Sequence, residues 1–245
     1  MSEFHESSTR PQKRSFIKAF KAWRGMLRAI RVGDNNKRLQ YILELLGYLE
    51  GDYYYREWQR LSSQFSDFSL SEKLKEAKHM PKDSLGHSYY LHVTDGKEDK
   101  FSLLSASSSH SDRSDRFSIF RKRTLEIHDL IHVVMGYDKS RMGEACVIRA
   151  SASAGLPPAW NFFMLLGMVR QTWVRGLWNG IGVWRACMIE PKRRVRNVQN
   201  WNDIRWEELL DKPLEDVKRR LGIGPSPVYD RLIGYSNHVD KEWTN

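Results

Sequence analysis

Apolar residues recur every three or four positions along most of this 245-residue chain, and this spacing restricts the fold to packed helices. Helices are predicted over residues 37–61, 117–136, 141–154 and 158 to about 190. Two shorter helices should follow, separated at Pro213 and closed at Gly222. No alternating stretch of useful length predicts a strand. The sequence therefore predicts an all-α fold with a single compact helical domain.

Composition divides the chain into a helical domain and two less regular ends. We expect a disordered N-terminus at 1–12, a basic amphipathic helix at 13–36, the helical domain at 37–235 and a tail at 236–245. A hydrophobic content of 40% is sufficient for one sizeable core. The two cysteines, Cys146 and Cys187, favour a reducing compartment, with a single disulfide between them as the alternative.

The N-terminal helix combines an aromatic and aliphatic stripe with basic residues. The stripe has helical spacing and consists of Phe16, Phe20, Trp23, Leu27 and Ile30. The basic residues are Lys18, Lys21, Arg24, Arg28 and Arg31, with no acidic residue among them. Such a helix suits an anionic membrane surface, but it could equally pack its stripe on the core. A mitochondrial targeting segment fits less well, because acidic residues stand at Glu3 and Glu6.

The charge balance narrows the choice of partners. The formal net charge is +10, which attracts nucleic acid or phospholipid surfaces. No nucleic-acid recognition motif accompanies it, so we expect no nucleic-acid partner and favour a peripheral membrane interaction over a merely soluble basic protein. The longest uncharged run, between Arg149 and Arg170, is split by Pro157 and Pro158 and predicts no transmembrane helix. No secretory signal is expected either.

The segment H-D-L-I-H holds two histidines, His128 and His132, that lie one turn apart on one face of the predicted helix. Both imidazoles can therefore face one metal ion. Asp129 lies about 100° round the helix from His128, where it could ligate the ion, orient a histidine or act as a base.

A glutamate further along the chain completes the candidate metal site. Gly136 and Gly143 bracket a predicted turn, after which a second helix begins near Met142. That turn should bring Glu144 back over the first helix. Two histidines with carboxylates from two packed helices suit zinc or another divalent metal.

Short histidine motifs also occur in other enzyme classes and by chance. The peptidase motif H-E-x-x-H is disfavoured, because Asp129 stands where its glutamate would be. A metal phosphohydrolase of the HD type also places His-Asp on a helix, but it needs another histidine upstream and a distant aspartate downstream. Upstream candidates are His87, His92 and His110. This class stays a minor alternative.

The signature H-D-x-x-H-x11-E resembles that of the coenzyme Q (ubiquinone) biosynthesis family. The similarity extends from Lys122 to Ala145, and M-P-K-D-S-L-G-H-S-Y-Y and W-E-E-L-L-D-K-P-L-E-D-V-K-R-R-L-G-I are similar to the family's flanking segments. It covers about 37–230 in order. The chain departs from the family at Ile131 and at 134–135, which are not ligand positions. The basic N-terminal helix is not part of the resemblance.

The resemblance implies an oxidative decarboxylation at ring C1 of a polyprenylated 4-hydroxybenzoate-derived intermediate. An alternative is a non-catalytic lipid-binding scaffold of a quinone biosynthesis complex. The implied metal ligands and catalytic residues are His128, Asp129, His132 and Glu144. We expect a divalent ion, zinc by preference, other ubiquinone biosynthesis proteins as partners and a homodimer. The expected location is the cytoplasmic face of a bacterial cell membrane, with the matrix side of the mitochondrial inner membrane as the alternative.

The isoprenoid tail of such a substrate needs an apolar trough, and the run that follows Pro158 is the candidate for it. Its predicted lipid-binding residues are Trp160, Phe163, Gly167 and Trp173. Most of these side chains could equally belong to a buried structural helix. Arg123 and Arg149 flank the metal motif, where they could meet an anionic head group or pair with acidic residues.

Overall fold

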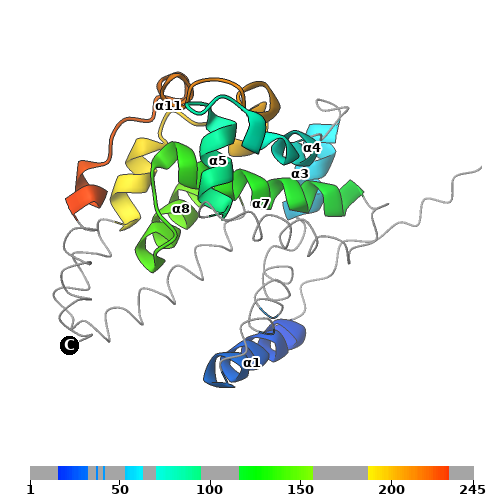
Figure 1. Cartoon of the computed structure of the whole chain (residues 1–245). Coiled ribbons are helices and arrows are strands. Elements are labelled where there is room, and N and C mark those ends of the chain that lie inside the picture. Colours follow the sequence, from blue (N-terminus) through cyan, green and yellow to red (C-terminus); the bar gives the residue numbers. More distant parts are fainter. Residues whose placement is uncertain are drawn as a thin grey trace, which may run out of the picture. The chain divides into compact units, whose positions relative to one another are not determined.

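The computed structural model describes residues 16–32, 37, 41, 53–62, 70–94, 116–156 and 187–231. Every regular element among them is a helix, which confirms the all-α prediction (Figure 1). The α-helices are α1 (Phe16–Val32), α3 (Tyr53–Ser62), α4 (Leu70–Lys75), α5 (Leu85–Thr94), α7 (Arg116–Met135), α8 (Arg141–Ser153) and α11 (Leu214–Leu221). The short 3-10 helices are η1 (Ala77–His79), η3 (Trp201–Asp203) and η4 (Trp206–Glu208).

The chain forms two compact units, an N-terminal unit at Met1–Gln64 and a C-terminal unit at Phe65–Asn245. α1 and α3 belong to the first unit, and the remaining elements belong to the second. Three predicted parts of the chain lie outside the described residues, namely the disordered N-terminus at 1–12, most of the helix at 158–190 and the tail at 236–245. No helix within the described ranges is long and apolar enough to cross a membrane.

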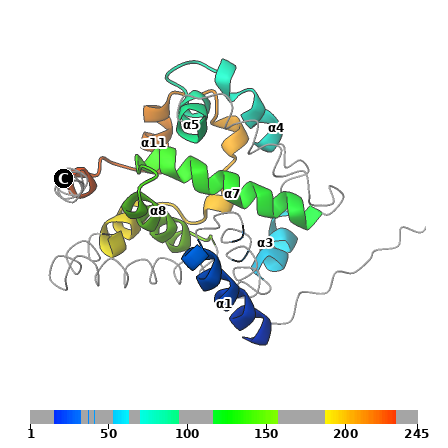
Figure 2. The same ribbon diagram turned by 60° about the horizontal axis from the view of Figure 1, so that its bottom comes forward.

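The C-terminal unit is built around α7, which contacts α4, α5, α8, α11 and η3 (Figure 2). Its C-terminal half is buried on several sides, because these neighbours cover it from different directions. The buried apolar side chains of this half are Ile127, Leu130, Ile131, Val133, Val134 and Met135. A helix enclosed in this way holds its remaining polar side chains in fixed positions.

The predicted C-terminal helix pair is confirmed in outline, and it closes the unit. η4 is a single 3-10 turn, and α11 follows Pro213 and ends at Gly222, whose positive φ of 68° supplies the left-handed cap. Two backbone bonds join this segment to the start of α5, from Leu85 N to Lys212 O (2.9 Å) and from Gly86 N to Leu210 O (2.8 Å). A Cβ at Gly86 would lie 2.1 Å from Met80 Sδ and 3.0 Å from that Leu210 oxygen, so the close approach favours glycine.

Two buried tryptophans anchor the same segment to α8. Trp201 and Trp206 stack with ring centroids 6.0 Å apart. The Trp201 indole donates to Ala150 O on α8 (3.1 Å), and the Trp206 indole donates to Trp201 O (3.1 Å). Both N–H groups are therefore satisfied inside the core, as large buried indoles require.

The turn between α7 and α8 has the form that its glycines predicted. α7 ends at Met135, and Gly136 follows with a φ of 67°. Ser140 caps α8 by accepting from Gly143 N (3.1 Å). Tyr229 closes the turn, since its hydroxyl donates to Asp138 Oδ1 (2.7 Å) and accepts from Asp138 N (3.2 Å).

We expect Tyr229→Phe to lower the free energy of unfolding by about 1 kcal/mol at neutral pH, because the ring stays and the hydrogen bonds are lost. Burial alone would raise the pKa of Asp138, but hydrogen bonds from Ser140 and Tyr229 outweigh it and hold that pKa below 3.8. A depressed pKa contributes stability above the unfolded-state value and loses it as the pH falls through the folded-state value.

The difference in the free energy of unfolding between wild type and Tyr229→Phe should therefore become smaller in acid. Urea unfolding of both proteins, at neutral pH and at a pH below the folded-state pKa of Asp138, measures this difference. A difference that is the same at both pH values would show that the Asp138 carboxylate is not the group that Tyr229 stabilises.

Candidate metal centre

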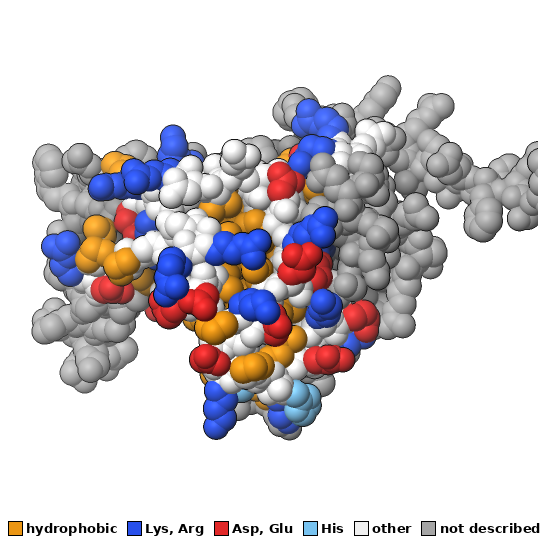
Figure 3. All heavy atoms as spheres, turned by 90° about the horizontal axis from the view of Figure 1, so that it is seen from above, with side chains coloured by type: hydrophobic (Ala, Val, Ile, Leu, Met, Phe, Trp, Pro, Cys, Tyr) orange, Lys and Arg blue, Asp and Glu red, His pale blue; other side chains and the backbone are white. Residues whose placement is uncertain are grey.

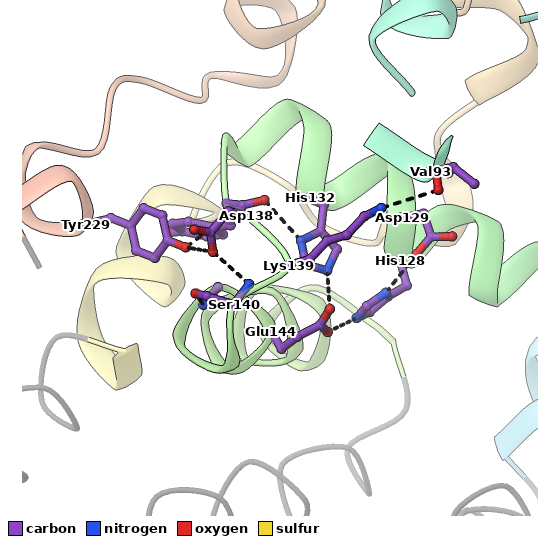
Figure 4. A network of polar contacts seen from close by, with 11 residues as sticks. Val93, His128, Asp129, His132, Asp138, Lys139, Ser140, Glu144 and Tyr229 are labelled. Atoms are coloured by element: carbon purple, nitrogen blue, oxygen red, sulfur yellow. Dashed lines mark hydrogen bonds and ion pairs between the residues drawn. The ribbon is translucent and has the colours of Figure 1, made fainter. Parts of the chain in front are cut away.

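α7 carries both predicted histidines, and it positions their rings on the face that turns towards α8. His128 and His132 lie one turn apart with ring centroids 5.0 Å from each other and an interplanar angle of 75° (Figure 4). His132 is buried, with 1% of its side chain exposed, and His128 is 16% exposed. The buried neighbours of α7 thus fix one histidine closely and leave the other at the edge of the core.

The predicted return of Glu144 over α7 is confirmed. This residue stands in the first turn of α8, where a negative charge also suits the helix dipole. Its Oε1 lies 3.3 Å from His132 Nε2, and its Oε2 lies 3.8 Å from His128 Nε2. One ligand atom from each of the three residues falls within 4.8 Å of the others. His128, His132 and Glu144 therefore form a group that could hold a metal ion.

The hydrogen bonds of His132 support this interpretation. Its Nδ1 donates to the carbonyl of Tyr137 (3.1 Å), since a carbonyl can only accept. In the neutral ring, Nε2 then carries a lone pair that faces the Glu144 carboxylate. A proton on the ring or a metal ion between the two groups would make this 3.3 Å approach attractive.

A proton would compete with a metal ion at this position. Burial by itself lowers the pKa of His132, but the hydrogen bond and charge of Glu144 and the Tyr137 carbonyl outweigh burial and raise the pKa above its ordinary value. A histidine must lose its proton to bind a metal, so the carboxylate that would attract an ion also stabilises the competing proton.

Asp129 lies on the other side of His128. Its Oδ1 is 3.4 Å from His128 Nδ1, whereas His128 Nε2 is the nitrogen that faces Glu144. In Figure 4 its carboxylate points away from the Glu144 side of the histidine. Of the three roles that the sequence left open, this position fits the orientation of His128, in which a carboxylate accepts the second ring N–H of a metal-binding histidine.

Two residues near the site were not assigned to it from the sequence. His92 on α5 lies against His132, with ring centroids 4.9 Å apart. Burial, with the nearby charges of His132 and Lys139, lowers the pKa of His92 to about 4, so its ring is neutral at neutral pH. The Lys139 side chain crosses the front of His132 in Figure 4, and its ammonium donates to Val93 O (3.3 Å).

The half-buried carboxylate of Glu190 supports the residue that orients His132. The Tyr137 hydroxyl donates to Glu190, which also accepts from Ser226 and lies 3.6 Å from Arg194 Nε. The Arg194 guanidinium lies over the Tyr137 ring, 5.1 Å from its centroid. These contacts fix the phenol end of Tyr137 while its carbonyl receives the His132 N–H.

The remaining predicted site residues lie apart from this group or outside the described residues. Arg123 is buried and paired with Glu207 of η4, one of the two arrangements that the sequence allowed. The Arg149 guanidinium donates to Met188 O (3.2 Å). The described atoms bring neither arginine into the metal group. The predicted lipid-binding residues Trp160, Phe163, Gly167 and Trp173 are not among those that the structure describes.

Comparison with known proteins identifies the family. The family "Coenzyme Q (ubiquinone) biosynthesis protein Coq4" matches residues 60–227, which cover more than half of the chain. The chain therefore belongs to the Coq4 family, and this membership places it in coenzyme Q biosynthesis. The minor alternative of an HD-type phosphohydrolase receives no support from this match.

A solved structure agrees at the level of the fold. A protein of Nostoc punctiforme assigned to ubiquinone biosynthesis superimposes with a TM-score of 0.55 at 17% identity, over 84% of this chain and 97% of that one. At this identity the likeness shows a shared fold and not a shared function. No curated protein sequence matches the chain significantly.

We expect the purified wild type, stripped of metal and reloaded with zinc, to retain about one equivalent per chain by mass spectrometry of metals. His132→Ala and Glu144→Ala should retain little, because each removes one of three ligands. His79→Ala is the matched control, since His79 is exposed and not part of the group. Unchanged metal content in His132→Ala would contradict the ligand assignment.

Asp129 is tested by two substitutions. If it orients His128, Asp129→Ala should weaken zinc binding by about 10- to 100-fold. Asp129→Asn keeps an oxygen that accepts the His128 N–H, so most of the affinity should remain. Competition with a fluorescent zinc chelator measures both variants. Equal loss in the two variants, as complete as in His132→Ala, would instead make Asp129 a ligand.

Proposed function

We propose that this member of the Coq4 family is a metal-dependent enzyme that removes the ring carboxylate from C1 of a polyprenylated 4-hydroxybenzoate-derived intermediate, with oxidation at that carbon by dioxygen. The carboxylate would leave as CO2, one oxygen atom of dioxygen would become the C1 oxygen of a quinone, and the other would leave as water. The observation that carries the proposal is the group of His128, His132 and Glu144, in a chain whose family acts in coenzyme Q biosynthesis. Three protein ligands are the usual set for a catalytic zinc site, which keeps a further position for substrate.

Each of the three ligands would contribute differently to metal binding. His132 supplies a fixed nitrogen, because burial and the Tyr137 carbonyl determine its orientation and tautomer. His128 supplies the second nitrogen, oriented by Asp129, and Glu144 supplies the charge. A bound divalent ion would act as a Lewis acid that stabilises negative charge on the substrate oxygens as the carbon–carbon bond breaks.

Lys139 and His92 are placed to shape the substrate side of the site. The positive charge of the Lys139 ammonium, which donates to Val93 O (3.3 Å), would attract a substrate carboxylate to this side of the group. The neutral ring of His92 adds a polar wall without a competing positive charge. In this proposal Lys139 takes the part that the sequence had suggested for Arg123 and Arg149.

The proposal extends to the setting in which the protein works. The substrate is a lipid, so we place the protein peripherally on the cytoplasmic face of a bacterial cell membrane, or on the matrix side of the mitochondrial inner membrane. The tail of the substrate would lie along the segment with Trp160, Phe163, Gly167 and Trp173. Other ubiquinone biosynthesis proteins and a second copy of the chain are its proposed partners, and zinc is the proposed metal.

A non-catalytic scaffold that holds the same lipid is the second candidate. The carboxylates of Glu144 and Asp129 are 43% and 40% exposed, so the site is open to solvent on one side. An open site that binds an anionic head group could hold the lipid intermediate without converting it.

We expect zinc-loaded wild type to release labelled CO2 from a prenylated 4-hydroxybenzoate-type substrate carrying ¹³C in its carboxylate, in air-saturated buffer with detergent. His132→Ala should release at least about 100-fold less, because the ion is lost. His79→Ala should match wild type. Equal release from wild type and His132→Ala would reject metal-dependent catalysis. Binding of the substrate without any CO2 release from metal-loaded wild type would favour the scaffold.

A further inference from the structure

Part of the predicted apolar stripe of α1 is exposed. Among the described side chains of this helix, Ala22 and Met26 are buried, at 3% and 5% exposure. Phe20 and Leu27, which belong to the predicted stripe, are 54% and 37% exposed. These two side chains are therefore not packed into a core, Trp23 is half-buried, and the side chains of Phe16 and Ile30 lie outside the described part of the helix.

Helical geometry places the exposed apolar side chains beside basic ones. Phe20 and Leu27 are seven residues apart and so lie within about 20° of each other around the helix. Arg24 follows Phe20 by one turn, and Arg24 and Arg28 are exposed one turn apart. Trp23 extends the apolar edge, with its ring 5.7 Å from that of Phe20. α1 thus has an exposed aromatic and aliphatic edge with a row of arginines next to it.

The charge of α1 has a single sign. Its sequence contains three arginines, two lysines and no acidic residue. The face of the molecule in Figure 3 differs, because acidic and basic side chains are interspersed on it. α1 therefore carries charge of one sign, whereas the face in Figure 3 carries both signs.

We propose that α1 docks the protein on an anionic phospholipid surface, with Phe20, Trp23 and Leu27 in the interface and Arg24 and Arg28 at the head groups. Large apolar residues beside a basic row are what an interfacial helix requires, since the apolar edge enters the acyl boundary and the cations attract anionic lipids. Each basic side chain near such a surface contributes on the order of fivefold to membrane partitioning. An acidic protein would satisfy the arginines but not require bilayer lipid.

The docking surface specifies how the protein reaches the membrane of the proposed function, yet it does not depend on the chemistry at the metal group. Detergent-solubilised substrate removes the need for docking, so CO2 release in detergent tests the reaction alone. Vesicle binding without substrate tests α1 alone. Failure of one proposal therefore leaves the other intact.

The experiment is flotation of the full chain with vesicles of phosphatidylcholine alone or with added phosphatidylglycerol. Wild type should float with the anionic vesicles, less so at high salt, and stay behind with the neutral ones. The double variant Arg24→Glu, Arg28→Glu should bind at least about 25-fold more weakly. The control Lys192→Glu, Arg193→Glu changes the net charge equally at exposed positions outside α1 and should bind like wild type.

The double variant Phe20→Ser, Leu27→Ser tests the apolar edge, because it keeps every charge of α1. It should bind the anionic vesicles more weakly than wild type by at least about tenfold. Both side chains are exposed, so circular dichroism should be unchanged. Wild type that fails to float with anionic vesicles would overturn the proposal. The proposal would also be overturned if the Lys192→Glu, Arg193→Glu control weakened vesicle binding as much as Arg24→Glu, Arg28→Glu. That result would show an effect of net charge and not docking through α1.

Discussion

The contact of the α8 N-terminus with the turn that precedes it is the constraint on which the candidate site depends. A Cβ on Gly143 would collide with the Asp138 carbonyl and would lie 2.6 Å from the Tyr229 hydroxyl. Only glycine therefore lets α8 start where it does. Glu144 is the next residue, so the same close approach sets its carboxylate against His132 and His128. A shift of this helical turn would separate the three ligands without altering any of them.

The site is rigid on one side and open on the other. His132 is held from behind through Tyr137, whose carbonyl takes the ring N–H and whose hydroxyl bonds to Glu190. The half-buried Glu190 carboxylate also accepts from Ser226 and lies beside Arg194, which compensates its charge. The buried Arg123 and the half-buried Glu207 form a second ion pair, which joins α7 to η4. Ion pairs that are largely shielded from water in this way fix positions more than they add stability.

The sequence predicted those parts of the site that depend on local geometry. Helical spacing placed His128 and His132 together, and two glycines marked the turn that returns Glu144. Local spacing could not place His92, because α5 meets α7 through contacts between segments about forty residues apart in the sequence. For the same reason it left open whether Arg123 binds a head group or pairs with Glu207. In α1 the helical spacing of the apolar residues correctly predicted a helix, but it did not show which of these side chains are buried.

The arrangement of charge implies an order of binding at the centre. Glu144 lies opposite two ring nitrogens, and without a cation it favours a proton on His132, whose pKa it raises. A bound divalent ion would take the place of that proton and would give the group of His128, His132 and Glu144 a net positive charge. An anionic substrate would be attracted more strongly to this second state, and the Lys139 ammonium would add to the attraction. Metal binding would therefore precede substrate binding, whether the protein converts the lipid or only retains it.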